Sequence, residues 1–282
     1  NLNLKFYTYL NMKTKQKIFI ARILSKILIF FLGKFKFRIK RNNINWELDI
    51  REGIDLSIFI FNNFEKSILK IANILLKKKK LDIIDIGSNM GVHTLNFSKE
   101  FSDSKVYSIE ATNFAFNKLE KNIYLNQNLK NISFHQIFLS NKKYKKKKVY
   151  SSWNLNNKKN QIHKKHMGML KSTSNSKLMS LDNFIKEMKI NRKTLIKFDV
   201  DGNELFVFKS GKNYFKKFKP FIIMELAPYL YKENGYETKE LIDYLLGFKY
   251  KFYDTQTLKK IDDIHKFTKN INDGSSVNIF LK

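Results

Sequence analysis

The sequence predicts an α/β fold, in which a mostly parallel sheet carries helices on both faces. From residue 81 onward, short apolar runs typical of buried strands alternate with helical segments, a pattern typical of parallel sheets. A glycine-containing loop follows the first of these strands, as in sheets that bind nucleotide-like ligands. The 282 residues include 43% hydrophobic residues, enough for a substantial core, which excludes global disorder.

Residues 1–34 are predicted to form a basic amphipathic helical segment that precedes the sheet. The apolar run IFIARILSKILIFFL at 18–32 is shorter than the roughly 20 residues that a membrane span requires, and it contains Arg22 and Lys26. Lys15 lies seven residues before Arg22 and therefore shares its helical face. Residues 17–32 leave two alternatives open: peripheral contact with an anionic membrane surface, or docking on the protein's own domain or on a second subunit of a homodimer.

Residues 35–80 are predicted to form a small β leader followed by a helix. Alternation of apolar and polar residues indicates strands in FKFRIK at 35–40, NINWELDI at 43–50 and LSIFIF at 56–61. Residues 64–76 then show helical spacing, and a lysine run ends the segment.

Residues 81–282 form the predicted main domain, with strands and helices in alternation. The expected strands are 81–86, 105–109, 132–137, 194–198, 220–224, 250–253 and 277–281, and the expected helices lie near 92–100, 113–127, 181–189, 203–217 and 237–246. The polar segment 254–276 shows no clear helix, so the last two strands are predicted to pair as an antiparallel hairpin. The connection 138–193 is too long for a simple loop, which indicates a functional lid or a disordered segment.

The motif DIIDIGSNMG at 82–91 is the first candidate binding loop. Gly87 can take a tight turn, and Gly91 lets the next helix begin close to the sheet, where its N–H groups attract anions. The dinucleotide fingerprint G-x-G-x-x-G would need glycine where Asn89 and Val92 stand, so NAD is disfavoured, and the absence of G-K-[ST] excludes a P-loop. The pattern G-x-N-x-G after Asp85 therefore suits a different cofactor.

A second acid follows the next strand, which ends in VYSIEAT. Glu110 lies 23 residues after Gly87, where it can accept hydrogen bonds from both hydroxyls of a ribose. Taken alone, Asp85 is better explained as a helix or loop cap, and Glu110 as a solvated loop acid. Two acids at the ends of adjacent strands, on either side of a glycine loop, instead indicate a nucleoside cofactor.

Six motifs in order resemble the FkbM-type S-adenosylmethionine-dependent methyltransferase family: DIIDIGSNMGVHTL, VYSIEAT, KNIYLN, SLDNFI, LIKFDVDGNE and PFIIMEL. The resemblance covers residues from about 45 to 282 and implies a class I methyltransferase-like (Rossmann-like) seven-stranded fold. It also implies S-adenosylmethionine as cofactor and O-methylation of a sugar, a glycan or a small natural product. By resemblance, the cofactor is held by Asp85, Gly87, Ser88, Asn89, Gly91, Glu110, Ala111 and Ser140.

Two positions depart from the family pattern. Asp201 stands where the family usually has glutamate, and His93 stands where an aromatic residue is frequent. Both changes leave the fold intact, but both can alter the reacting end of the site.

The acceptor side is predicted at the carboxyl ends of the fourth and fifth strands. Lys197 lies in a strand buried on both faces, where a lysine is costly unless it is paired, so a lysine–carboxylate network is expected beside the reacting methyl group. The candidate catalytic residues are Lys197, Asp199, Asp201 and Glu225, with Glu204 at the start of the next helix. Three roles stay open for this cluster: a general base, a divalent cation site and a structural network.

The composition bears on partners and location. The formal net charge is +29, but of the 54 basic residues five are arginine and 49 are lysine. Arginine is the usual residue for phosphate and guanine recognition, so compositional bias is favoured over a nucleic-acid partner. The absence of cysteine excludes disulfides and thiol catalysis and fits a reducing compartment, so the expected location is cytoplasmic, with peripheral contact at the inner membrane surface as an extension. The spacing of His163 and His166 suits a metal, but their lysine-rich surroundings favour a solvated loop.

Two alternatives to a methyltransferase of small or glycan-like acceptors remain. The charge suggests a nucleic-acid methyltransferase, although DVDGNE lacks the proline and the aromatic residue that such enzymes use to stack a base. The helix at 17–32 suggests a catalytically silent membrane-surface module that has kept the fold.

Overall fold

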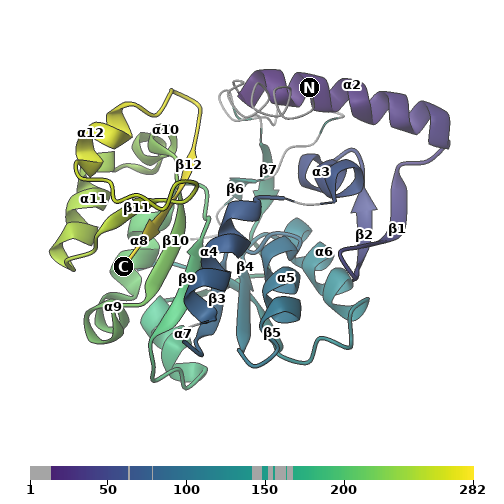
Figure 1. Ribbon diagram of the computed structural model, residues 1–282. Coiled ribbons are helices and arrows are strands. Elements are labelled where there is room, and N and C mark those ends of the chain that lie inside the picture. The colour runs from purple at the N-terminus through teal and green to yellow at the C-terminus, as the bar shows by residue number, and fades with distance from the viewer. Residues whose placement is uncertain are drawn as a thin grey trace. The chain divides into compact units, whose positions relative to one another are not determined.

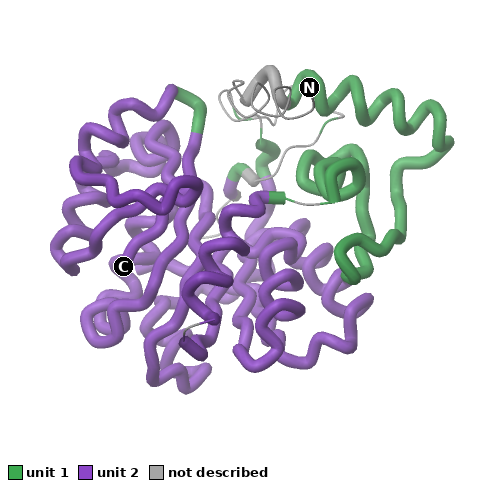
Figure 2. The backbone as a smooth tube through the Cα atoms, viewed as in Figure 1, with its two compact units in different colours: residues 1–64, 150–170, 273–275 green, residues 65–149, 171–272, 276–282 purple. Residues whose placement is uncertain are grey.

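The computed structural model describes residues 14–62, 64–77, 79–141, 148–151, 155, 163 and 168–282, with side chains from residue 18 onward. The chain divides into two compact units (Figure 2). The first comprises residues 1–64, 150–170 and 273–275, and the second comprises residues 65–149, 171–272 and 276–282. The domain boundaries predicted at 34/35 and 80/81 stay predictions. The lysine run at 145–147, most of SSWNLNN, His166 and the side chain of Lys15 lie outside the described residues.

The second unit is built on an eight-stranded sheet with the order β11-β12-β10-β9-β3-β4-β5-β8 (Figure 1). All pairs are parallel except those of β12, which runs antiparallel to both β10 and β11. The strands are β3 (Asp82–Ile86), β4 (Val106–Glu110), β5 (Ile132–Leu139), β8 (Lys177–Met179), β9 (Thr194–Phe198), β10 (Phe221–Leu226), β11 (Phe252–Asp254) and β12 (Val277–Leu281). The predicted α/β class and the antiparallel closing pair are confirmed. The sheet has one strand more than predicted, because the short, polar-flanked KLM segment adds β8 at its edge.

Helices cover both faces of this sheet. They are α4 (Lys66–Leu76), α5 (Val92–Glu100), α6 (Asn113–Tyr124), α7 (Leu181–Glu187), α8 (Glu204–Ser210), α9 (Lys212–Phe218), α10 (Pro228–Tyr231), the 3₁₀ helix η2 (Lys232–Asn234), α11 (Thr238–Gly247) and α12 (Ile264–Lys269). The single helix predicted at 203–217 is wrong. It divides at Gly211, where a Cβ atom would lie 2.6 Å from Leu181 Cδ2, so α8 and α9 meet α7 closely. The prediction that 254–276 is irregular throughout is also wrong, because α12 lies within it.

Two apolar layers bury the strands from both sides. Ile84 and Ile86 point into the cluster formed with α7, α8, α9 and α11, whereas Ile83 points into the opposite cluster with α4 and α5. Successive residues of a strand face opposite sides, so a strand covered twice must be apolar throughout. This is why Asp85, fully buried within β3, needs an internal partner.

The first unit contains α2 (Thr14–Leu32), the antiparallel hairpin β1 (Lys36–Arg41) and β2 (Ile44–Asp49), and α3 (Gly53–Phe61). The prediction of a strand at LSIFIF is wrong, because this run forms the greater part of α3. A short, nearly continuous apolar run has no clear period. Buried Asp55, directly before it, accepts a hydrogen bond from the Asp49 N–H at 2.6 Å, which stabilises the helical turn after β2. Ile18, Ile50, Leu56 and Leu155 form the core of this unit. A two-stranded sheet pairs β6 (Lys148–Ser151) with β7 (Met169–Ser172).

Candidate active site

The candidate site lies at the carboxyl ends of β3, β4 and β9. From β3 the chain adds β4, β5 and β8 on one side of the sheet, and β9 and β10 on the other. The strand order therefore reverses between β3 and β9, which is where open α/β sheets bind ligands. The loops that leave these strands carry the residues singled out from the sequence.

Glycine is required at two positions of the loop after β3. Gly87 has φ +75°, and a Cβ atom there would lie 1.7 Å from the carbonyl oxygen of Asp199. Gly91 has φ +92°, and its Cβ atom would lie 2.7 Å from Leu119 Cδ1 on α6. The close approach expected of Gly91 is thus to a neighbouring helix, whereas Gly87 lets the β3 loop touch the backbone that follows β9.

Glu110 is fixed against the glycine loop. Asn89 adopts the left-handed conformation with φ +50°, and its N–H donates to Glu110 Oε2 at 2.9 Å. Thr112 donates to Oε1 of the same carboxylate through its N–H at 2.8 Å and its hydroxyl at 2.7 Å. Burial raises the pKa of Glu110, and the hydrogen bonds from Thr112 and Asn89 oppose that rise. The result is a buried carboxylate held in one orientation, whose oxygens keep further lone pairs for a ligand.

Lys197 bridges two carboxylates at the centre of the site, those of Asp85 and Asp199. The register of β3 and β9 places Asp85 beside Lys197, and Asp199 follows two residues later. The lysine Nζ lies 3.2 Å from Asp199 Oδ2 and 3.8 Å from Asp85 Oδ1, and it donates to the Gly87 carbonyl at 3.3 Å. Thr94 Oγ1 donates to Asp85 Oδ2 at 2.7 Å. The lysine–carboxylate network expected from the sequence is present.

The charge state of Lys197 follows from these neighbours. Burial lowers the pKa of a lysine, but the charges of Asp199, Asp85 and Glu65 outweigh it and raise the pKa of Lys197 overall. The group therefore stays an ammonium ion across the physiological range. It can orient carboxylates, but it cannot accept a proton.

Three further carboxyl groups lie near Asp199. Burial is the main cause of the raised pKa at Asp201, Glu204 and Glu225, and the charge of Asp199 raises each of them further. The pKa of Glu204 rises to about 7. Asp201 adopts a left-handed conformation with φ +49°, and Glu225 accepts a hydrogen bond from Ser276 Oγ. A carboxyl group whose pKa lies near neutrality, as at Glu204, is suited to exchange protons.

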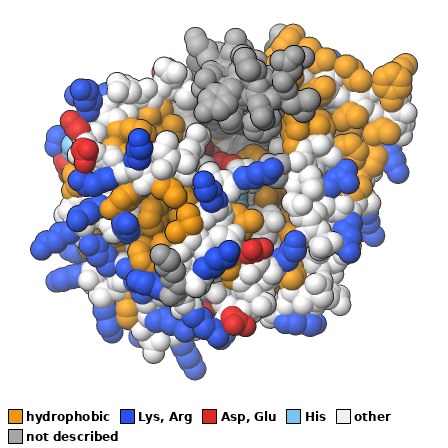
Figure 3. Space-filling view, in the orientation of Figure 1, with side chains coloured by type: hydrophobic (Ala, Val, Ile, Leu, Met, Phe, Trp, Pro, Cys, Tyr) orange, Lys and Arg blue, Asp and Glu red, His pale blue; other side chains and the backbone are white. Residues whose placement is uncertain are grey.

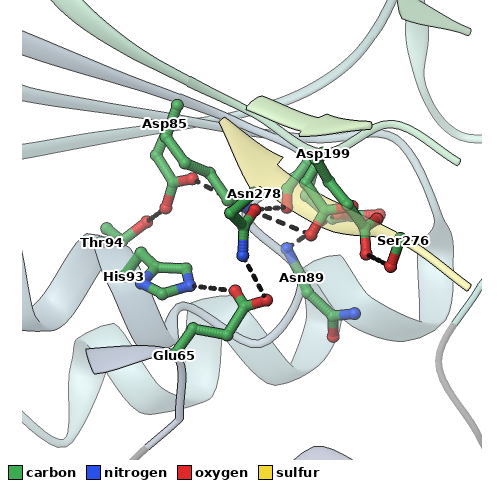
Figure 4. Close-up of polar contacts among 12 residues, drawn as sticks. Glu65, Asp85, Asn89, His93, Thr94, Asp199, Ser276 and Asn278 are labelled. Atoms are coloured by element: carbon green, nitrogen blue, oxygen red, sulfur yellow. Dashed lines mark hydrogen bonds and ion pairs between the residues drawn. The ribbon is translucent and has the colours of Figure 1, made fainter. Parts of the chain in front are cut away.

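A second polar cluster includes residues that the sequence did not single out. Glu65, at the start of α4, has φ +49°, and its Oε2 lies 3.0 Å from His93 Nε2 (Figure 4). Its Oε1 accepts a hydrogen bond from Asn278 Nδ2 at 3.0 Å. Burial would raise the pKa of Glu65, but hydrogen bonding and charge from His93, and the charge of Lys197, lower it overall. Glu65 and Asn278 belong to no motif and are 213 residues apart, so no sequence signal identified them.

The loop offers polar groups to a ligand. Ser88 Oγ and Asp85 Oδ1 are buried and have no hydrogen-bond partner among the described residues. Buried polar atoms are nearly always hydrogen-bonded in proteins, so two such atoms at the start of the glycine loop fit a polar ligand. Together with the N–H groups at the start of α5, they fit a cofactor with a nucleoside and an amino-acid part.

Two of the predicted cofactor residues are placed without a described contact to the glycine loop. Ala111 is half-buried between Glu110 and Thr112. Ser140 is buried, and its N–H donates to the Met179 carbonyl at 3.0 Å, where β5 meets β8. The roles assigned to all the site residues stay predictions. His163 is buried, with its ring 4.8 Å from that of Tyr150, and does not lie in a solvated loop. In the described part of the chain, no group of three or more His, Cys, Asp or Glu residues could hold a metal ion.

A family model identifies the family of the chain. A family model described as the methyltransferase FkbM domain matches residues 85–252, which is more than half of the chain. A search of curated proteins found no match. The chain is similar to the solved structure of methyltransferase FkbM from Methylobacillus flagellatus KT, with 13% identity, a TM-score of 0.43 and coverage of 72% of this chain and 44% of that one. It therefore spans less than half of that protein's length.

Two further solved structures are similar to the chain at comparable identity and TM-score. The first is precorrin-6y C5,15-methyltransferase from Geobacter metallireducens GS-15, with 8% identity, a TM-score of 0.38 and coverage of 75% of this chain and 85% of that one. The second is the plantazolicin methyltransferase BpumL in complex with SAH, with 11% identity, a TM-score of 0.40 and coverage of 77% and 80%.

Proposed function

Because the chain belongs to the FkbM methyltransferase family, we propose that it transfers a methyl group from S-adenosylmethionine to a hydroxyl of a sugar, a glycan or a small natural product. The observation that carries this proposal is the fixed carboxylate of Glu110 against the backbone of Asn89, at the point where the strand order reverses. A ribose needs an acceptor for two hydroxyls, and Glu110 is buried, oriented and close to the glycine loop.

The loop and its surroundings supply the remaining cofactor contacts. Glu110 would accept hydrogen bonds from the ribose hydroxyls, and the N–H groups at the start of α5 would face the carboxylate of the methionine part. Ser88 Oγ is buried and has no hydrogen-bond partner among the described residues, and Asp85 Oδ1 has none beyond its 3.8 Å ion pair with Lys197; both would pair with its polar atoms. When bound, this cofactor supplies a methyl group on a positively charged sulfur, which is open to attack by an oxygen nucleophile.

The carboxyl groups around Asp199 provide the acceptor side. An acceptor hydroxyl must lose its proton as the new bond to carbon forms, so a positioned base accelerates the transfer. Lys197 stays protonated and holds Asp199, which leaves Asp201 and Glu225 as the bases. The pKa of both carboxyl groups is raised, with burial as the main cause and the charge of Asp199 as a second one. A carboxylate with a raised pKa is a stronger base than an ordinary one.

Calorimetry with the full chain tests the cofactor, and a methyl-donor assay tests the reaction. The wild-type chain should bind S-adenosylmethionine, and Glu110→Gln should weaken binding by roughly tenfold or more, since a hydrogen bond to a charged group contributes about 1.5–3 kcal/mol. Glu100→Gln, at an exposed position of α5, is the matched control and should bind like the wild type. Mass spectrometry of a panel of sugars and metabolites should then detect a gain of one methyl group on oxygen. A wild-type chain with no affinity for the cofactor would refute the proposal.

A further inference from the structure

The helix α2 exposes an apolar face although its opposite face is already packed. Its inner side, which includes Ile18, Ala21, Leu28 and Ile29, packs into the core of the first unit. On the other side, Phe19, Phe30 and Phe31 are 64%, 80% and 77% exposed. We call this second side the α2 outer face; it comprises Phe19, Ile23, Ile27, Phe30 and Phe31, all exposed. Hydrophobic side chains gather over α2 in the space-filling view (Figure 3).

The spacing of these residues makes one continuous strip. With 3.6 residues per turn, positions 19, 23, 27 and 30 follow one another along a single side of the helix. Single exposed apolar residues are normal on protein surfaces, but a contiguous strip of large ones marks a contact site. Its occupant must therefore be apolar at its centre.

Positive charge surrounds the α2 outer face. Residues 18–41 contain seven basic residues and no acidic residue. Lys26 lies on the edge of the strip itself, at an exposed position of α2. After the helix, exposed Lys34 leads into β1, where the exposed residues alternate with partly buried ones and are Lys36, Arg38 and Lys40. Of these, Arg38 is paired with Glu47 of β2.

We propose that the α2 outer face and the basic residues that follow it bind the surface of an anionic lipid bilayer. A helix with exposed aromatic and aliphatic side chains beside lysines lies in the plane of the headgroups, with its apolar strip among the upper acyl chains. No helix in the described ranges is long and apolar enough to cross a membrane. Each lysine near anionic headgroups adds attraction, and the exposed lysines of this segment, Lys26, Lys34, Lys36 and Lys40, are suited to it.

A second copy of the chain is the competing occupant. Pairing two α2 outer faces would bring two acid-free basic segments together, and like charges across an interface oppose association. An anionic bilayer meets both requirements at once, because it offers acyl chains and negative charge. This inference goes beyond the proposed methyl transfer and does not depend on it.

Flotation of the full chain with lipid vesicles tests the apolar part. The chain should float with vesicles of equimolar phosphatidylcholine and phosphatidylglycerol and remain unbound with phosphatidylcholine alone. Phe19→Ser with Phe30→Ser should weaken binding by roughly a hundredfold, at about tenfold for each side chain withdrawn from lipid. The matched control, Leu246→Ser with Tyr124→Ser, changes two exposed apolar residues elsewhere and should leave binding unchanged.

A second pair of variants tests the charge. Lys34→Glu with Lys36→Glu should abolish most of the binding to anionic vesicles, whereas Lys212→Glu with Lys216→Glu, which changes the net charge equally, should not. Equal binding to neutral and anionic vesicles, or equal loss in both charge variants, overturns the proposal. The proposal is also overturned if the wild-type chain stays in the unbound fraction during flotation. If light scattering then shows a dimer, and Phe19→Ser with Phe30→Ser dissociates it, a second copy of the chain is the occupant of the α2 outer face.

Discussion

Replacing Lys197 by methionine should destabilise the protein far more than the loss of an ordinary surface ion pair. The ammonium lies 3.2 Å from Asp199 and 3.8 Å from Asp85, and its side chain is 5% exposed. Methionine is unbranched and only one atom shorter than lysine, but it leaves two carboxylates without their counter-charge. Breaking a buried pair by removal of one partner costs about 3–5 kcal/mol. The matched control is Lys209→Met, whose pair with Glu240 spans 2.8 Å but is partly exposed on both sides, and this should cost about 0–1 kcal/mol.

Urea unfolding at neutral pH measures both costs. Lys197→Met should lower the midpoint without a change of slope, and adding Asp199→Asn should restore part of the loss, because fewer charges then remain unpaired. The pH dependence has a definite sign. The folded-state pKa of Lys197 is raised above 10.5, so its contribution is complete below pH 10.5 and is lost as the pH rises through the folded value. If Lys197→Met costs no more than Lys209→Met, the lysine does not hold the carboxylates together.

Three other predictions concern the same site. The pKa of Glu204 rises from 4.5 to about 7 because the carboxyl group is buried, so its stabilisation is present below pH 4.5 and is lost by about pH 7. Over that interval the free energy of unfolding of the wild type should fall by about 3 kcal/mol relative to Glu204→Gln, and identical pH profiles would contradict this. Gly87→Ala should destabilise the fold by clearly more than Gly235→Ala. Both glycines have a positive φ, which alone should cost about 1–2 kcal/mol at Gly235, but only at Gly87 would the added Cβ atom also clash with backbone atoms. Glu225→Gln should lower kcat by roughly 10²–10⁴ with little effect on cofactor affinity, and an unchanged kcat would exclude Glu225 as the base.

Local patterns predicted the framework of the sheet and the glycine loop. Strands such as β3 and β9 are short, mostly apolar and fully buried, and Gly87 follows β3 directly. The single lysine within β9 also predicted a lysine–carboxylate network, because a buried ammonium group requires a charged partner. The partner Asp85 then followed from the register of two neighbouring parallel strands.

Tertiary contacts determined what the sequence could not show. LSIFIF has no clear period, and its helical form depends on buried Asp55 and on packing against β2. Glu65 meets His93 and Asn278 only because α4 begins beside the ends of α5 and β12. His93 was singled out as a departure from the family pattern, but its partner came from a segment without any motif. Residues that meet from distant segments of the chain have no characteristic spacing in the sequence, so no motif predicts their contact.

The net charge of the chain and the charge of its candidate site have opposite signs, and a change of salt concentration should affect the binding that depends on each of them differently. The net charge is +29, and the lysines of the described residues are mostly exposed, where ions screen them, whereas the carboxylates around Lys197 interact within the protein. Raising the salt from about 0.15 M to about 1 M shortens the Debye length from about 8 Å to about 3 Å. Binding to anionic vesicles through the first unit should then fall steeply, while calorimetric affinity for S-adenosylmethionine in the second unit should change little. A parallel loss of both would mean that surface lysines, and not the buried acids at the ends of β3, β4 and β9, govern cofactor binding.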